Sequence, residues 1–150
     1  MYHRRWRHAA FVVLALALAV PAALAEAPIG YVKTSEGEAW IVRGERVAAD
    51  VGTPLMTHDV IETGADGALG VTFEDNTVIS VGPNSRLAID EYAFDSSAME
   101  GNFLASLQQG SLTATSGDIA RTGPDAMQIA TPDAILGVRG TFFAVKVDPR

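Results

Sequence analysis

Side chains able to carry out chemistry are sparse after the first 25 residues of this chain. His58 is the only histidine there, and it stands in a Thr57-His58-Asp59 turn. Nucleophilic catalysis needs a nucleophile, a base and a group that orients the base. No Gly-x-Ser-x-Gly segment supplies a nucleophile to pair with His58. We therefore predict no catalytic residues and no enzymatic activity, and we interpret His58 as a solvated turn residue.

Metal and nucleotide sites have as little support. A zinc site needs three or four nitrogen, sulfur or oxygen ligands, and the chain has no cysteine. Glu74, Asp75 and Asn76 form the nearest cluster of oxygen ligands for calcium, but they lie where we expect a solvated hairpin tip. No phosphate-binding loop is present. We predict no metal and no cofactor. Paired carboxylates for glycoside chemistry stay open, without a second feature to support them.

The first 25 residues have the pattern of a secretory signal peptide. Arg4, Arg5 and Arg7 precede an apolar run over 9–20, and Ala23-Leu24-Ala25 has the small-x-small form of a cleavage site. The run is short for a membrane span, which needs about 20 residues. We predict cleavage after Ala25, a periplasmic or secreted protein and no membrane span after cleavage. Retention of the segment as an N-terminal anchor is the alternative. The absence of cysteine excludes a lipoprotein anchor and disulfides.

The remaining chain is acidic and has the size of one domain. The whole sequence has 18 Asp and Glu against 11 Lys and Arg, and residues 1–25 hold three of the arginines and none of the acids. Negative charge repels phosphate backbones, so we predict no nucleic-acid partner. A length of about 125 residues suits a single domain with one core, here residues 26–150.

The stretch Leu69–Tyr92 predicts a three-stranded meander. Apolar and other residues alternate over 69–73 and again over 77–81, which is the period of half-buried strands. A three-residue loop, 74–76, pairs Leu69 with Val81 and Val71 with Ile79, whereas a shift by one residue would turn apolar side chains outward. Such a loop needs a left-handed residue in third place, which Asn76 tolerates. A turn at Gly82-Pro83-Asn84-Ser85 then leads into a strand from Arg86.

About ten short strands at a regular spacing predict an all-β fold. We expect stacked antiparallel hairpins, either solenoid-like or sandwich-like, with a preference for the stacked form because several strands are apolar on both faces. Segments 103–107 and 111–115 are predicted to form a hairpin across Gln108-Gln109-Gly110, and residues 93–101 to be the least ordered. The remaining predicted strands are 29–33, 38–43, 60–63, 127–130, 134–138 and 142–147, with turns at 44–46 and a loop at 50–54.

Four motifs together resemble the FecR-type periplasmic domain. They are Asp59-x-Ile61-x-Thr63-Gly64, the hairpin tip with Asp75 and Thr77, the Gly82-Pro83-Asn84-Ser85 turn, and the terminal pattern Thr131, Pro132, Ala134, Gly137, Arg139, Gly140, Thr141 and Phe143. The resemblance covers roughly residues 30–147. His58 and Asn76 stand where the family usually has Gly. Asn76 keeps the hairpin, and His58 indicates a turn without positive φ.

The resemblance implies a sensory or protein-interaction module of the cell envelope with an envelope protein as partner. The family's iron-uptake regulators resemble anti-sigma factors, with a sigma-binding segment and a transmembrane helix before this domain. We expect only a signal peptide here, so sigma-factor binding is not implied. A periplasmic module that binds a small ligand or carbohydrate is the alternative. Partner identity and oligomeric state are not predicted.

Arg139 is the one cation of the terminal motif. A guanidinium has five donors and keeps its charge, so when buried it needs a carboxylate or several carbonyls. We predict a structural clamp in which Arg139 binds Asp59, Asp66, Asp90 or backbone carbonyls, with a ligand anchor and an exposed side chain as the alternatives. Pro132 and the flanking Gly137 and Gly140 are expected to shape the backbone around it.

Overall fold

The computed structural model describes residues 25–140 and 142–149, and they form one all-β domain, as predicted. The predicted signal peptide lies almost wholly outside these residues and stays a prediction. No helix among the described residues is long and apolar enough to cross a membrane. The elements are β1 (Gly30–Glu36), β2 (Ala39–Arg43), β3 (Glu45–Ala48), β4 (Pro54–Leu55), β5 (Val60–Thr63), β6 (Ala68–Phe73), β7 (Val78–Val81), β8 (Arg86–Asp95), β9 (Glu100–Thr115), the 3₁₀ turn η1 (Ile119–Arg121), β10 (Met127–Ala130), β11 (Ile135–Gly137) and β12 (Phe142–Val147).

The central hairpin has the predicted register. Leu69 lies opposite Val81 and Val71 opposite Ile79 in the antiparallel β6–β7 pair. The amide of Phe73 donates to the Thr77 carbonyl at 2.9 Å, which closes the three-residue loop. Asn76 has a φ of 66°, the left-handed conformation expected of the third loop residue.

Two turns differ from their predictions. His58 has a φ of 71°, so its turn does use positive φ, and the prediction to the contrary is wrong. The amide of His58 donates to the Ile89 carbonyl at 2.8 Å, which holds the turn against β8. Residues 45–48, which include the last two residues of the predicted turn at 44–46, form the edge strand β3, because Gly44 at a φ of 71° makes a tight hairpin that pairs Arg43 with Glu45.

Strand β9 is one strand of 16 residues, so the predicted hairpin across 108–110 is wrong. Residues 100–109 pair with β8, and residues 112–115 pair with β7. Gly110 lies between the two parts with a φ of 89°. This glycine bends the strand from one layer of the sheet into the other without reversing it. The reason is that the two halves of β9 pair with different strands, β8 in one layer and β7 in the other.

The segment predicted to be least ordered continues the β8–β9 hairpin. Asp95 is the last residue of β8, and its Oδ1 accepts hydrogen bonds from the Ser97 amide at 2.9 Å and the Ser97 hydroxyl at 2.6 Å. These bonds, with that from the Ala98 amide at 3.2 Å, keep the pKa of Asp95 below its ordinary value. The polar residues are therefore turn chemistry rather than a sign of disorder.

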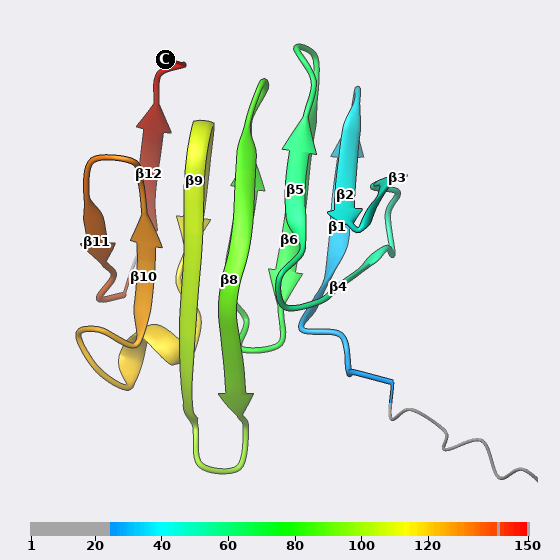
Figure 1. Cartoon of the computed structure of the whole chain (residues 1–150). Helices are drawn as coiled ribbons and strands as arrows, with labels where there is room; N and C mark the ends of the chain where they lie inside the picture. Colours follow the sequence, from blue (N-terminus) through cyan, green and yellow to red (C-terminus); the bar gives the residue numbers. More distant parts are fainter. Residues whose placement is uncertain (1–24, 141, 150) are drawn as a thin grey trace, which may run out of the picture.

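The strands make one sheet, antiparallel except for the parallel β9–β10 pair, that curls into two facing layers (Figure 1). Along the path β3-β2-β5-β8-β9-β7-β6-β1-β4, the first strands form one layer and the last ones the other, with β9 shared. In Figure 1, β5 lies in front of β6 and β2 in front of β1. On the far side of β9, β10 and β11 extend the first layer and β12 extends the second.

The chain crosses between layers at four corners, and these corners stack on one another. The Gly64 amide donates to the Glu38 carbonyl at 2.8 Å, the Asn84 amide to the Gly64 carbonyl at 2.9 Å, and the Gly82 amide to the Ser111 carbonyl at 2.9 Å. The fold thus combines the two predicted arrangements. Bent strand pairs are stacked, and their arms form the facing layers of a sandwich.

A single apolar core fills the space between the layers. Its fully buried large side chains come from both layers: Leu55, Ile61, Leu69, Ile79, Leu87, Ile89, Phe103, Leu107, Leu112, Ile119, Met127 and Ile129. Several strands bury alternate residues, as in β2, β5 and β7. Because the chain has no disulfide, burial of this core is the main source of stability.

Candidate interaction site

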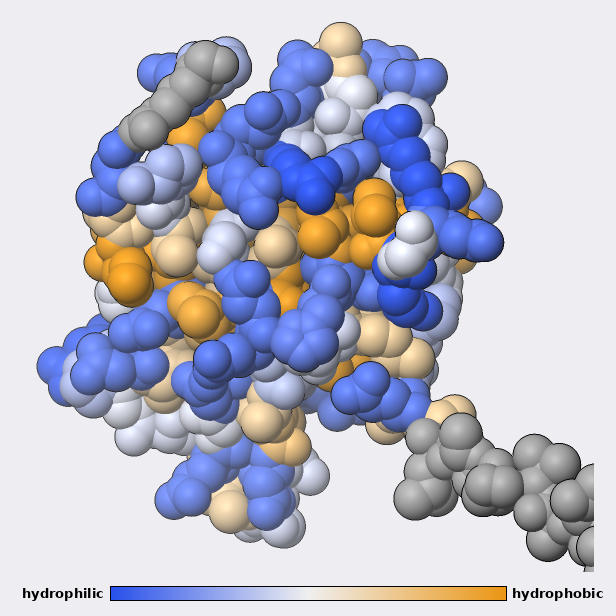
Figure 2. All heavy atoms as spheres, viewed as in Figure 1, coloured by the Kyte–Doolittle hydropathy of each residue, from blue (hydrophilic) through white to orange (hydrophobic). Residues whose placement is uncertain are grey.

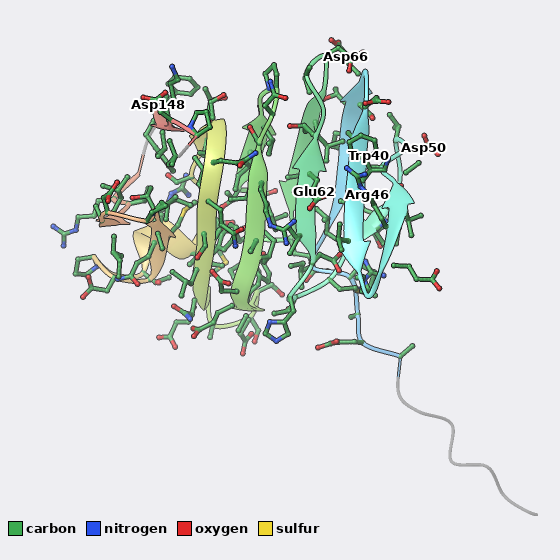
Figure 3. The ribbon with its side chains drawn as sticks, turned by 45° about the horizontal axis from the view of Figure 1, so that its top comes forward. Trp40, Arg46, Asp50, Glu62, Asp66 and Asp148 are labelled. Carbon is green, nitrogen blue, oxygen red and sulfur yellow. The ribbon has the colours of Figure 1, made fainter. Side chains whose placement is uncertain are left out.

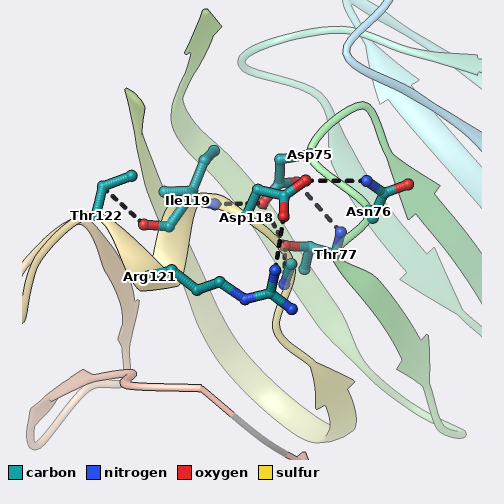
Figure 4. A network of polar contacts seen from close by, with 8 residues as sticks. Asp75, Asn76, Thr77, Asp118, Ile119, Arg121 and Thr122 are labelled. Carbon is teal, nitrogen blue, oxygen red and sulfur yellow. Dashed lines mark hydrogen bonds and ion pairs between the residues drawn. The ribbon is translucent and has the colours of Figure 1, made fainter. Parts of the chain in front are cut away.

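The hairpin-tip motif forms a buried polar cluster, which we call the Asp75 hub and define as Asp75, Thr77, Tyr92, Gly117 and Ile119. Asp75 is fully buried, and its carboxylate accepts hydrogen bonds from the Thr77 hydroxyl at 2.7 Å and the Ile119 amide at 3.2 Å (Figure 4). The Tyr92 hydroxyl donates to the same carboxylate at 3.1 Å, and the Thr77 amide at 3.3 Å. The Gly117 amide donates to the Thr77 hydroxyl at 3.0 Å. The hub thus joins the β6–β7 loop, β8 and the segment after β9.

Tyr92 belongs to both the hub and the core. Its ring stacks on Phe73 with centroids 5.5 Å apart and meets Phe103 edge-on at 5.2 Å. Burial, and then the charge of Asp75, raise the pKa of the Tyr92 hydroxyl far above its ordinary value. The hydroxyl is therefore protonated, and it both donates to the Asp75 carboxylate and accepts from the Asp75 amide at 3.0 Å.

The second motif, Gly82-Pro83-Asn84-Ser85, forms the corner between β7 and β8. The Thr63 hydroxyl donates to the Gly82 carbonyl at 2.6 Å and accepts from the Ser85 amide at 2.9 Å. Asn84 has a φ of 49°, and Pro83 and Asn84 are exposed. These residues shape a turn and present no chemistry.

Sequence reasoning missed an ordered polar network on the outer face of the first layer. The Arg46 guanidinium lies 3.6 Å from the centroid of the Trp40 ring and 3.2 Å from a Glu62 oxygen (Figure 3). Arg86 also pairs with Glu62. The sequence contained one indication of this network: Trp40, Glu62 and Arg86 each occupy an outward-facing position in the alternating pattern of their strands, and these strands pair. Without the order of those strands, which are distant in sequence, the signal could not be used.

Arg43 binds the buried carboxylate of Asp59, a pair that was also not foreseen. The Arg43 Nε and Nη2 each donate to one Asp59 oxygen at 2.6 Å, and the Met56 amide adds a bond at 2.8 Å. This bidentate bond raises the pKa of Arg43.

The prediction of a buried Arg139 clamp is wrong. Arg139 is exposed, and the three carboxylates named as its partners bond elsewhere. Asp59 pairs with Arg43, Asp66 accepts from the Glu38 amide, and Asp90 accepts from the Ser106 hydroxyl. The reason is topological. Arg139 follows β11, the outermost strand of its layer, so the guanidinium keeps its hydration.

The terminal motif instead shapes the backbone of the β10–β11 hairpin. The Thr131 amide donates to the Ala134 carbonyl at 2.7 Å, and the Ala134 amide donates to the Thr131 hydroxyl at 3.1 Å, with Pro132 exposed in the turn. Gly137 ends β11, and Gly140 has a φ of 62°, as expected where the chain leaves the first layer. Thr141 lies outside the described residues.

Beyond this hairpin, two strand edges face each other across an open cleft. Strand β11 ends the first layer and β12 ends the second. The cleft between them, here the terminal cleft, has a volume of about 220 Å³ and is lined by Leu136, Gly137, Val138, Arg139, Gly140, Phe143, Ala144 and Val145. Its lining residues are apolar or glycine apart from Arg139, the one cation among them.

An apolar row on the outer face of the first layer leads to the same edge. Val42, Val60 and Ala88 lie side by side on β2, β5 and β8, and pairing continues through Ser106 and Ala130 to Ile135. Ile135 is 67% exposed. Figure 2 shows apolar surface in a band across this face, between hydrophilic borders.

The described residues offer little for catalysis. His58 is exposed, as predicted, and no three His, Cys, Asp or Glu side chains among them come together as a metal site.

Comparison with known proteins agrees with the sequence motifs. The sequence model of the FecR protein family matches residues 59–150, which is more than half of the chain and runs from the start of β5 through β12. Comparisons with curated proteins and with solved structures found no match. Strands β1–β4 precede the matched region, although β1 and β2 contribute to the same core.

Proposed function

The chain belongs to the FecR protein family, and on that premise we propose that it is an exported, non-enzymatic sensory or protein-interaction module of the bacterial cell envelope. Membership of the family suggests a role in envelope signalling or sensing. In this proposal the module is delivered by the signal peptide over residues 1–25, cleaved after Ala25, and acts in the periplasm by binding a protein partner.

The observation that supports this proposal is the terminal cleft between two open strand edges. Unpaired strand edges present rows of backbone donors and acceptors that a partner strand can use. The apolar walls of the cleft add surface that gains free energy when a partner covers it. The net negative charge of the chain disfavours nucleic acid as its partner.

Site-specific photo-crosslinking in cells tests the proposal. A photoreactive residue at Ile135, beside the terminal cleft, is compared with one at Val51, a loop residue of matching exposure at 66%. We expect an adduct with an envelope protein from position 135 and none from position 51. Equal labelling from both positions, or no protein adduct from position 135, would count against a contact role for this edge. Mass spectrometry of the purified protein would show an N-terminus at Glu26.

A further inference from the structure

Strand β12 is longer than the other edge strands and lacks the features that usually keep an edge from pairing with another chain. The opposite ends of the sheet are β3, with Glu45 and Arg46 among its four residues, and β4, with two residues including Pro54. Charge, shortness and proline are the usual devices that keep an edge from pairing with another chain. Strand β12 has six residues, FFAVKV, with Lys146 as its only charge. Among the described residues it pairs with β9 alone.

The side chains of β12 that point inward are incompletely covered. Phe143, Val145 and Val147 pack against the core but stay half-buried, because the terminal cleft opens beside them. Phe142, Ala144 and Lys146 point outward, and Phe142 is 67% exposed. A strand added at this edge would continue the second layer and cover the apolar side chains in the cleft.

The charge distribution indicates what can approach this edge. Residues 25–130 carry 16 acidic and five basic side chains, whereas residues 131–149 carry two of each. Lys146 also pairs with Asp148 at 3.3 Å. Two copies of the chain therefore repel each other through most of their surface but not through this neutral end. Because this end has no net charge, it does not attract an acidic partner either.

From these observations we propose that β12 pairs with β12 of a second copy, in a two-fold symmetric antiparallel dimer with Ala144 opposite Ala144. Residues directly opposite each other in an antiparallel pair point to the same face, so the two-fold axis must lie midway between the two copies of one residue. With Ala144 on the axis, Phe143 faces Val145 of the other copy, an aromatic and β-branched pair on the inner side. Phe142 faces Lys146 on the outer side, which allows a cation–π contact.

The neighbouring register is poorer. With Val145 on the axis, Phe142 would face Asp148 and Ala144 would face Lys146, so both outer contacts lose complementarity. The small side chain of Ala144 also allows the two backbones to approach on the axis. The inference shares with the proposed function the premise that this edge is a contact surface, but it needs no other protein.

Because the chain has no cysteine, a single engineered thiol reports this register. Opposed residues in an antiparallel pair have Cα atoms about 4.5–5.5 Å apart, which suits a disulfide. We expect Ala144→Cys in the purified protein to form a covalent dimer under mild oxidation at least tenfold faster than Ser80→Cys. Ser80 is exposed on the same face of the second layer but lies on β7, two strands from the edge.

Charge at the axis gives an independent test by sedimentation. We expect the unmodified protein to form a dimer, and Ala144→Lys or Ala144→Glu each to raise the dimer dissociation constant at least tenfold, because like charges would face each other. A mixture of the two variants should recover a dimer. A monomer at every concentration, with Ala144→Cys no faster to crosslink than Ser80→Cys, would overturn self-pairing. Adducts of position 135 with another envelope protein would then still support the proposed function.

Discussion

The Asp75 hub and the terminal motif are the two most distinctive polar motifs of this chain, and they lie in opposite environments. Asp75 and Thr77 are completely buried, bonded to each other and to two other segments, β8 and the residues after β9. Arg139 is exposed beside an open cleft. A charged residue of a distinctive motif can therefore have either of two roles. When buried, as Asp75 is, it holds segments of the core together; when exposed, as Arg139 is, it forms part of a surface.

The two environments follow from which groups can replace water. A buried carboxylate needs several donors, and Asp75 obtains them from two hydroxyls and two backbone amides without a cation. A buried guanidinium needs acceptors for five donors. The candidate acceptors Asp59, Asp66 and Asp90 are already bonded to other residues, so Arg139 stays in water.

Removal of the Asp75 carboxylate should have the largest effect. We expect Asp75→Ala to lower the free energy of unfolding by roughly 3 kcal/mol, because the buried Thr77 hydroxyl and Ile119 amide lose their acceptor. Urea unfolding measures the change. Asp75→Asn, which keeps one acceptor oxygen, should cost about half as much. Equal stability of Asp75→Ala and the unmodified protein would mean that the hub does not hold these segments.

The hub should also make stability fall at alkaline pH. The pKa of Tyr92 is raised in the folded state, so its contribution is complete below the unfolded value of about 10 and is lost as pH rises above it. Tyr92→Phe should cost about 1 kcal/mol at neutral pH and make the decline between pH 9 and 11 shallower. Unfolding curves across that range measure both effects. Tyr31→Phe, at an exposed tyrosine, is the control and should leave the decline unchanged.

The smallest effect is expected at the terminal motif. Arg139→Ala and Arg139→Lys should each change the free energy of unfolding by less than about 0.5 kcal/mol, as is usual for exposed side chains. Thermal unfolding checks this. Arg43→Ala is the contrasting variant, because it leaves the buried Asp59 without its bidentate partner and should cost about 2 kcal/mol. A loss of similar size for Arg139→Ala would restore the clamp interpretation.

Local patterns were sufficient where neighbours in sequence are also neighbours in space. The β6–β7 register followed from the alternation over 69–81, and Asn76 in the loop from its tolerance of positive φ. Local patterns were insufficient where contacts with segments distant in sequence determine the conformation. Gly110 looked like the centre of a hairpin, yet the halves of β9 pair with β8 and β7 in different layers. The turn at His58 adopts positive φ because β8 holds it.

The sequence by itself determined an all-β, cysteine-free, acidic domain of the FecR family, because alternation, turn residues, charge and motif spacing are properties of the chain read in order. Only the tertiary structure decided which charges are buried and which strand edges are left open. Burial of Asp75 and exposure of Arg139 depend on segments brought together from across the chain, and the open edge of β12 depends on the order of all strands in the sheet. Those long-range contacts have no counterpart in any short stretch of sequence.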